Sequence, residues 1–183
     1  MDHGQAQVEL NNAFAGGSAG VLVSGLVWLA TSVVWFSSGL NTAFLILFAG
    51  GMMIHPASLF LCRVALRCPP ASASNPLNRL AMESTVTLMA GIAIAYVLLH
   101  RQPTLAIPSF AAIMGARYFI FRTLYESIVY WILGGFICAI ATLGLLGAVM
   151  PTGNIALIIG GAEIAFAIMV YSSWQKIRRQ AGG

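Results

Sequence analysis

Glu163 is the residue of this chain whose position most directly suggests chemistry. It lies in the segment GGAEIAFA, within an otherwise apolar run from Asn154 to Trp174. If that run is a helix that crosses a bilayer, a rise of about 1.5 Å per residue places Glu163 roughly 12 Å from the outer end, near the midplane. An ionised carboxylate costs at least about 2.5 kcal/mol to insert there. We therefore expect Glu163 to be a proton or ion site, or alternatively a protonated or paired residue that joins helices.

The stretch GARYFIFRTLYES, from Gly115 to Ser127, places charged and aromatic residues between two apolar runs. On a helix with about 100° per residue, part of this stretch forms one polar and aromatic arc of about 100°. The residues on the arc are Tyr118, Arg122, Tyr125 and Glu126. Arg122 and Glu126 can pair if the helix continues that far. Arg117 lies to one side and close to the expected cytoplasmic end, so it can also be a topological anchor that reaches the headgroups.

Two further positions combine polar side chains with apolar surroundings. His55 directly precedes Pro56 in the middle of an apolar segment, where a proline kink often lines a polar cavity in a membrane protein. Histidine titrates near neutral pH, although a single histidine can equally be a packing residue that forms one hydrogen bond. Glu83 lies about one turn inside a later segment, and its alternative role is to pair with Arg79 four residues earlier.

Several kinds of chemistry have no motif in this chain. It contains no phosphate-binding GxxxxGK[ST], HExxH or CxxC motif, and its only aspartate is Asp2. The cysteines, Cys62, Cys68 and Cys138, are expected to be reduced structural thiols. The basic residues form no stripe with interleaved aromatic residues, which excludes nucleic acid as an expected partner. We predict no metal site, no cofactor and no catalytic residue.

The composition places these residues in a membrane. Hydrophobic residues make up 59% of the 183 residues and charged residues 8%, against about 25% charged in soluble domains. Apolar runs of about 20 residues, the length that a bilayer-spanning helix needs, recur along nearly the whole chain. These runs do not alternate apolar and polar residues as the strands of a membrane barrel do. The predicted fold class is an all-α integral membrane bundle.

Short turns rich in Gly, Pro, Ser and Asn divide the chain into six predicted membrane helices. The predicted ranges are Gly17 to Ser37, Thr42 to Leu66, Arg79 to Leu99, Leu105 to Leu124, Ser127 to Met150 and Asn154 to Trp174. No Gly or Pro separates the fourth helix from the fifth around Arg122 to Glu126, so these two helices can be separate or continuous.

The basic residues near the helix ends predict the orientation. With both termini cytoplasmic, only Arg101 lies outside. The residues placed inside are Arg63, Arg67, Arg79, Arg117, Arg122, Lys176, Arg178 and Arg179. The N-terminus lacks the basic start of a cleaved signal, so we expect the first helix to be retained. Residues 1–16 are then a cytoplasmic or interfacial segment, residues 17–174 the six-helix domain and residues 175–183 a basic cytoplasmic tail.

Three segments carry a family resemblance. HPASLFLCR, NPLNRLAMES and IMGARYFIFRTLYES occur in this order, separated by apolar helices, and are most visible between His55 and Trp131. In this combination the chain resembles the uncharacterised membrane proteins of domain-of-unknown-function family 7010. The resemblance implies a small bacterial polytopic membrane protein, located in the inner membrane, and implies no substrate, reaction or catalytic residue.

The leading functional hypothesis is a transporter or channel for a small solute or ion. Its six helices would enclose a polar cavity on the cytoplasmic side, with Glu163 as a proton or cation site at the midplane. The candidate lining residues are His55, Glu83, Arg117, Tyr118, Arg122, Tyr125 and Glu126, with Pro56 as the kink. The expected partners are membrane lipid, an unidentified small solute or ion, and a second copy of the chain, because small-residue faces permit a homodimer.

Two other hypotheses stay open. The chain could be a membrane assembly or binding module whose polar cluster only joins helices, in which case the interior should be fully packed. It could instead be an enzyme that acts on a lipid or quinone, with His55 or Glu83 beside Tyr118 or Arg117 in a groove open to the lipid. We rank the enzyme last, because the chain lacks a nucleophile or metal set.

Overall fold

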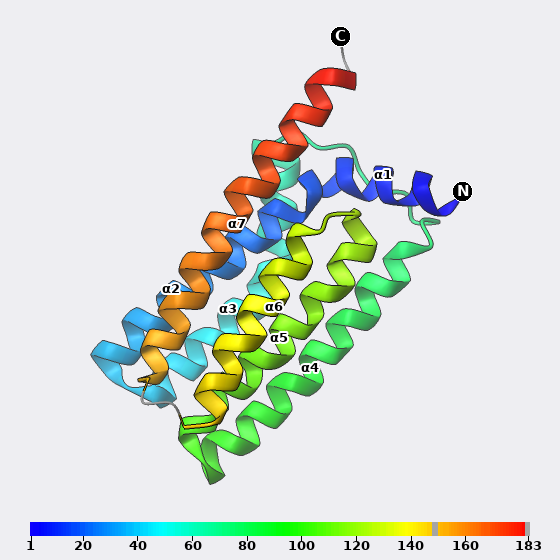
Figure 1. Ribbon diagram of the computed structural model, residues 1–183. Coiled ribbons are helices and arrows are strands. Elements are labelled where there is room, and N and C mark those ends of the chain that lie inside the picture. Colours follow the sequence, from blue (N-terminus) through cyan, green and yellow to red (C-terminus); the bar gives the residue numbers. More distant parts are fainter. Residues whose placement is uncertain (148–149, 182–183) are drawn as a thin grey trace.

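The protein is a bundle of helices in the computed structural model, which describes residues 1–147 and 150–181 (Figure 1). No strand occurs in this described part. The helices are α1 (His3–Phe14), α2 (Ser18–Ser38), α3 (Leu40–Phe60), α4 (Leu77–Arg101), α5 (Pro103–Tyr125), α6 (Val129–Leu145) and α7 (Thr152–Ala181). A short 3₁₀ turn, Ala15–Gly17, joins α1 to α2, and a π-helical turn, Leu61–Ala65, extends α3. The prediction of an all-α fold is confirmed.

The six predicted membrane helices correspond to α2 through α7. Five helical segments are long and apolar enough to cross a membrane, namely those that contain α2, α3, α4, α5 and α7. α6 is apolar but has only 17 residues, about 26 Å of helix, which is the lower limit for a span. It was predicted to continue to Met150 but ends at Leu145, and residues 148–149 of that prediction lie outside the described residues. α7 continues past the predicted end at Trp174.

α5 and α6 are separate helices, which answers the question that the sequence left open. Glu126 adopts the left-handed conformation (φ 51°, ψ 35°) and ends α5 directly after Tyr125. A residue with a Cβ atom adopts this conformation at a cost of roughly 1–2 kcal/mol. Side-chain amides of α1 compensate by donating to the last carbonyls of α5: Gln7 to Thr123 O (2.7 Å) and Asn11 to Tyr125 O (3.0 Å).

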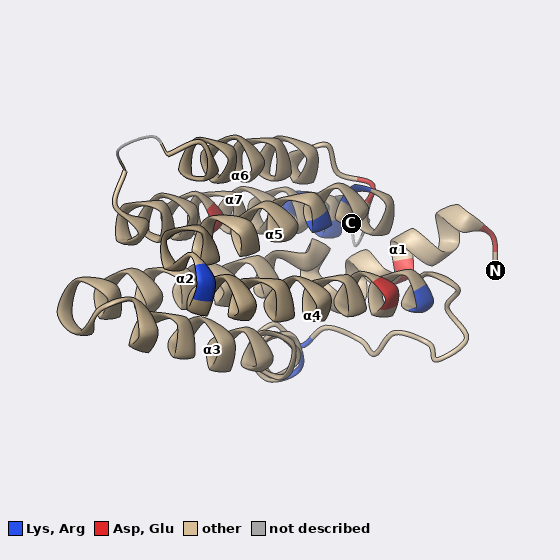
Figure 2. Cartoon of the chain, turned by 90° about the horizontal axis from the view of Figure 1, so that it is seen from below, with Lys and Arg blue, Asp and Glu red and all other residues tan. Residues whose placement is uncertain are grey.

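The helices pack as a series of neighbours. α2 lies between α3 and α7, α5 lies between α4 and α6, and α6 also contacts α7. α3 and α4 form the two ends of this series, and in the described structure these two helices do not pack along each other. Both lie on the side of the bundle opposite α6 (Figure 2). The space between α3 and α4 is therefore where the bundle is least closed.

Glycines allow the two tightest helix pairs. A Cβ atom on Gly25 of α2 would lie 3.0 Å from the carbonyl oxygen of Gly160 on α7, and one on Gly160 would lie 2.9 Å from that of Gly25. Gly115 of α5 and Gly134 of α6 meet in the same way, at 3.1 and 2.7 Å. Such close backbone approach is typical of membrane helices with small residues at their contact.

α1 crosses one end of the bundle, which we call the α1 end, and the last turns of α7 project beyond the same end (Figure 1). Ala6 and Leu10 of α1 are buried against Leu77 and Leu124. Glu9 accepts hydrogen bonds from the backbone amide of Ser72 and from the Asn75 side chain, so α1 also holds the loop between α3 and α4.

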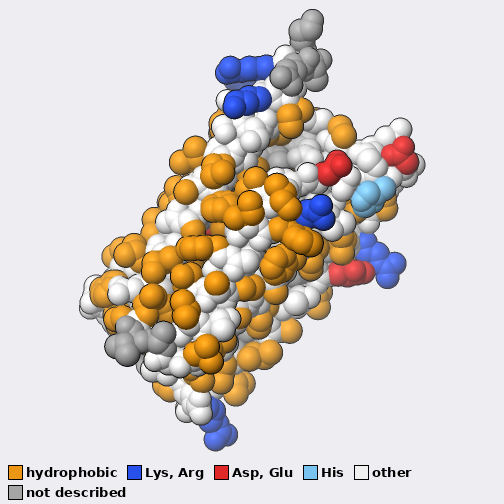
Figure 3. Space-filling model, viewed as in Figure 1, with side chains coloured by type: hydrophobic (Ala, Val, Ile, Leu, Met, Phe, Trp, Pro, Cys, Tyr) orange, Lys and Arg blue, Asp and Glu red, His pale blue; other side chains and the backbone are white. Residues whose placement is uncertain are grey.

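The surface fits a bilayer. Hydrophobic side chains cover the middle of the face seen in Figure 3, and charged side chains lie mainly toward its ends. Large apolar residues are exposed on the lipid-facing sides of most helices, as with Val33, Leu45, Val86 and Ile168. In water such continuous apolar surface would mark an interaction site, whereas in lipid it is the expected exterior. The chain is an integral membrane protein.

Candidate functional site

Glu163 is fully buried in the centre of the bundle. Its side chain is 0% exposed, and the hydroxyl of Tyr118 on α5 donates a 2.6 Å hydrogen bond to its Oε1 atom. Its other oxygen, Oε2, has no hydrogen-bond partner among the described residues, and neither has the buried hydroxyl of Ser24 on α2. A buried polar atom without a partner costs about 1–3 kcal/mol and calls for an explanation such as a water, an ion or a ligand.

A cavity of about 500 Å³ lies beside this carboxylate. Segments of α1, α2, α3, α4 and α5 line it, and most of its wall is apolar, including four methionines. The polar lining residues are Ser24, His55, Ser58, Asn78, Thr85, Arg117, Tyr118 and Tyr125. Glu163 is not among the lining residues, although its hydrogen-bond partner Tyr118 is. Tyr118 and Ser24 line the cavity and also face Glu163, so their side chains lie between the cavity and the carboxylate.

Arg117 presents a charge to this cavity. Its Nε atom donates to Ser84 Oγ (3.3 Å), its Nη2 atom donates to Thr85 Oγ1 (3.4 Å), and the guanidinium lies 5.0 Å from the centre of the Phe121 ring. These contacts are long and neutral. In the described structure the sole ion pair joins Arg79 to Glu83, so no carboxylate pairs with Arg117. The guanidinium of Arg117 lies between α4 and α5, against Ser84, Thr85 and the Phe121 ring.

An aromatic cluster positions Tyr118. The Tyr118 ring stacks on Tyr130 of α6 with ring centres 6.1 Å apart, and Phe121 packs edge-on against both. The Tyr130 hydroxyl in turn donates to the carbonyl of Gly16. Gly17 has a positive φ of 82°, and a Cβ atom there would collide with the Tyr130 hydroxyl. The glycine-rich turn between α1 and α2 therefore anchors the ring system that aims Tyr118 at Glu163.

The structure brings together only part of the predicted cavity lining. His55, Arg117, Tyr118 and Tyr125 line the cavity, and His55 lies on its exposed rim. α3 continues through Pro56 to Phe60 before it widens into the π-helical turn.

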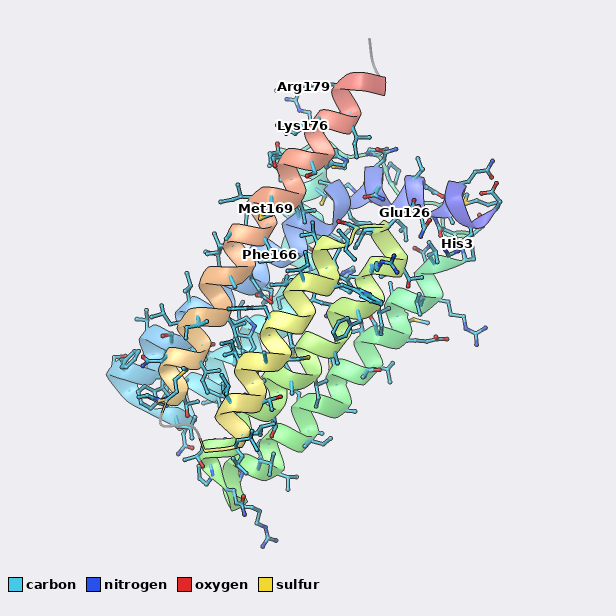
Figure 4. All side chains as sticks on the ribbon, viewed as in Figure 1. His3, Glu126, Phe166, Met169, Lys176 and Arg179 are labelled. Atoms are coloured by element: carbon cyan, nitrogen blue, oxygen red, sulfur yellow. The ribbon has the colours of Figure 1, made fainter. Side chains whose placement is uncertain are left out.

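Three predicted lining residues lie elsewhere. Glu83 is exposed and pairs with Arg79 at 3.0 Å, the alternative that the sequence allowed. Arg122 is exposed and covers the ring of Trp131 at 4.8 Å. Glu126 is exposed at the turn after α5 (Figure 4), and because the helix ends at Tyr125, it does not form the expected pair with Arg122.

Two features of the site were absent from the predictions. Nothing in the sequence marked Ser24 among the other small residues of α2, and the pairing of Tyr118 with Glu163 joins positions on helices distant in the sequence. The sequence predicted a depth for Glu163 but not which residue it meets.

All three cysteines are free thiols in the described structure. Cys62 and Cys68 are free and buried in one cluster with Trp174, and burial raises the pKa of the Cys68 thiol above its ordinary value. Within residues 1–147 and 150–181 no three His, Cys, Asp or Glu side chains gather in a way that could hold a metal ion.

The comparison with known proteins gives a family. The model of the family of unknown function DUF7010 matches residues 4–173, which extends the resemblance through the first and last membrane helices. No curated protein and no solved structure matches the chain significantly. The predicted membership is confirmed: with a match over nearly its whole length, this membrane protein belongs to the DUF7010 family.

Proposed function

We propose that this protein transports a small solute and couples the movement to a proton carried by Glu163. The observation that carries the proposal is the 2.6 Å hydrogen bond between Glu163 and Tyr118, a residue whose side chain also lines the cavity. A carboxylate buried inside a membrane is expected to have a functional role unless it is paired with a charge. Glu163 forms no ion pair with any residue that the structure describes.

The arrangement supports a two-state mechanism. When Glu163 is ionised, Tyr118 stabilises one oxygen, and the free Oε2 requires a second donor. When Glu163 is protonated at Oε2, that atom becomes a donor and requires an acceptor instead. Because Glu163 lies on α7, Tyr118 on α5 and Ser24 on α2, a change in its charge alters the contact among three helices at once. In this proposal, solute in the cavity shifts Tyr118 or Ser24 and gives a proton access to Glu163.

The same proposal includes an orientation and a membrane. The α1 end carries most of the basic residues, whereas Arg101 lies at the opposite end of α4. By the excess of basic residues in cytoplasmic loops, the α1 end faces the cytoplasm of a bacterial inner membrane. The cavity then belongs to the cytoplasmic half of the bilayer. Gly161, which has no atom close to its Cβ position, leaves room for a second copy of the chain.

A second candidate function is catalysis on a lipid or quinone. It is supported by one observation: His55, Arg117 and Tyr118 all line the same cavity. In that case His55 would act as an acid or base, and His55→Gln should abolish turnover. In the transport proposal His55 lies at the rim of the cavity and has no chemical role. Flux should therefore continue in the His55→Gln variant.

The test is proton movement in vesicles that contain the purified full chain and a trapped pH indicator. The probes are sodium, magnesium, succinate, inorganic phosphate and hexadecyl phosphate, each added outside with the membrane potential clamped. We expect at least one probe to change the internal pH, and Glu163→Gln to reduce that rate at least tenfold. Glu83→Gln is the matched control, because this carboxylate lies outside the cavity. Equal rates for Glu163→Gln and the native chain, or no rate above protein-free vesicles, would overturn the proposal.

A further inference from the structure

The charge on Arg117 restricts what the cavity can hold. A guanidinium inside a membrane normally pairs with a carboxylate or with backbone carbonyls. Here its recorded partners are two hydroxyls at 3.3 and 3.4 Å and one aromatic ring. The lining of the cavity includes no acidic residue among those that the structure describes. A ligand with an anionic group would provide the missing partner, and Arg117 offers the forked donors that suit a carboxylate or phosphate.

The mouth of the cavity restricts how that ligand enters. Both α3 and α4 line the cavity but do not pack along each other. Besides His55, the exposed lining residues of α3 and α4 are methionines: Met52 (56% exposed), Met82 (65%) and Met89 (46%). All three lie on membrane-spanning segments, so the mouth opens sideways toward lipid.

The other end of the cavity is covered. Leu10 and Phe14 of α1 form part of the lining at the α1 end, where hydrogen bonds hold α1 to α5 and to the loop before α4. An ion from the aqueous phase therefore meets an apolar cover, whereas a molecule dissolved in the bilayer meets an open, flexible methionine surface.

The size and the wall of the cavity indicate an apolar tail. Its volume of about 500 Å³ lies in the range of about 300–1,000 Å³ that small-molecule sites occupy. The wall of the cavity is made mainly of Leu, Met, Phe, Ile and Val side chains. Among its polar groups, Arg117 carries the charge. Ser24 adds a buried hydroxyl without a partner among the described residues.

We infer that the cavity binds an anionic single-chain amphiphile taken laterally from the bilayer, with its headgroup at Arg117 and its alkyl chain between α3 and α4. This inference rests on the proposed function and names the substrate class of the same cavity. The headgroup beside Arg117 would lie next to Tyr118, so that binding and the protonation of Glu163 are coupled through a single hydrogen bond.

The experiment measures binding to the full chain in a neutral maltoside detergent by native mass spectrometry. The probes are hexadecyl phosphate, hexadecanol and inorganic phosphate, which separate the charge from the chain. We expect hexadecyl phosphate to bind at least tenfold more tightly than hexadecanol and inorganic phosphate alone not to bind. Arg117→Gln should remove the advantage of the phosphate headgroup. Arg122→Gln, which alters an exposed arginine on the same helix, should retain it.

A second variant tests the same cavity independently, in case Arg117→Gln does not fold. Ala81→Phe fills the cavity from α4 without a change of charge and should weaken the binding of both long-chain probes. Inorganic phosphate that binds as tightly as hexadecyl phosphate would identify the site as one for a free anion and overturn the inference. Equal losses in Arg117→Gln and Arg122→Gln, or unchanged binding in Ala81→Phe, would also overturn it.

The outcome is separable from that of the transport proposal, because Glu163 does not line the cavity. Glu163→Gln should still bind hexadecyl phosphate. Binding without any proton-coupled flux would contradict transport and leave the amphiphile site standing. Flux of another probe without binding of hexadecyl phosphate would contradict the amphiphile site and leave transport standing.

Discussion

At the scale of single residues, the environment of each charged group separates structural from functional candidates. Arg79 and Glu83 neutralise each other on an exposed helix face, and Arg122 covers a tryptophan ring. Arg117 and Glu163 form no ion pair in the described structure. Exposed pairs contribute about 0–1 kcal/mol and rarely require a functional explanation. Charged groups inside a bilayer that have no partner of opposite charge do require such an explanation.

Tyr118→Phe should destabilise the protein, because it removes the hydrogen bond that Glu163 accepts. Leaving a buried polar group without a partner costs about 1–3 kcal/mol, so we expect the free energy of unfolding in detergent to fall by that amount. Tyr125→Phe is the matched control, since no hydrogen bond of the Tyr125 hydroxyl is recorded in the described structure. Equal effects of the two substitutions on thermal unfolding would show that the Tyr118 hydroxyl contributes nothing to stability.

At the scale of helices, contacts between specific elements explain how the site is built. α2, α5 and α7 bring Ser24, Tyr118 and Glu163 together, and the glycine contacts set how closely α2 approaches α7. α1 closes the end of the bundle by supplying amide donors to α5.

Gly160→Ala should separate α2 from α7, because the new Cβ atom would lie 2.9 Å from the backbone oxygen of Gly25. Such overpacking typically costs about 1–3 kcal/mol, which a lower unfolding temperature would reveal. The neighbouring Gly161→Ala has open space around its Cβ position and should leave stability unchanged or raise it by up to about 1 kcal/mol. The prediction fails if the two adjacent substitutions have the same effect.

Asn11→Ala should loosen the end of α5, because Tyr125 O loses its 3.0 Å hydrogen bond from the Asn11 side chain. We expect a loss of about 0.5–1.5 kcal/mol in unfolding free energy and faster hydrogen exchange in the turn that follows α5. Asn12→Ala changes an exposed neighbour on the same helix and should alter neither quantity. A similar exchange rate in both variants would indicate that α1 does not secure this turn.

At the scale of the whole molecule, a predominantly apolar exterior and charges mainly toward the ends describe a bundle held in a bilayer (Figure 3). α2 to α7 make six passes between the two ends if α6, with 17 residues, also spans. Basic residues are concentrated at the α1 end, and this asymmetry predicts the orientation in the membrane.

Cysteine labelling tests this orientation. In a chain with its native cysteines replaced by alanine, Ala73→Cys reports on the exposed loop at the α1 end and Gln102→Cys on the turn between α4 and α5. We expect a membrane-impermeant maleimide added to intact bacterial cells with a permeable outer membrane to label Gln102→Cys alone. Labelling of Ala73→Cys alone would show that the orientation is the opposite of the predicted one.

The fold was largely predictable because a bilayer imposes one rule everywhere: each span must be apolar and must satisfy its own backbone hydrogen bonds. Apolar length therefore located α2 to α7, and most of the predicted helix ends lie within a few residues of the observed ones. The rule placed a boundary beside Tyr125 but did not decide whether the two helices are separate or continuous there. Glu126 takes a left-handed conformation without a glycine, and α1 stabilises the end of α5 from more than a hundred positions away in the sequence.

The sequence by itself determined the class, the approximate positions of the helices and the family, since these depend on local composition and short motifs. Only the tertiary structure decided which polar residues meet. A helical wheel placed Tyr118 and Arg122 on one arc, yet the packing of α5 between α4 and α6 directs Tyr118 inward to Glu163 and leaves Arg122 on the surface. Side chains within a single arc of about 100° can still face different neighbours, and which neighbour each one meets is a property of the assembled bundle.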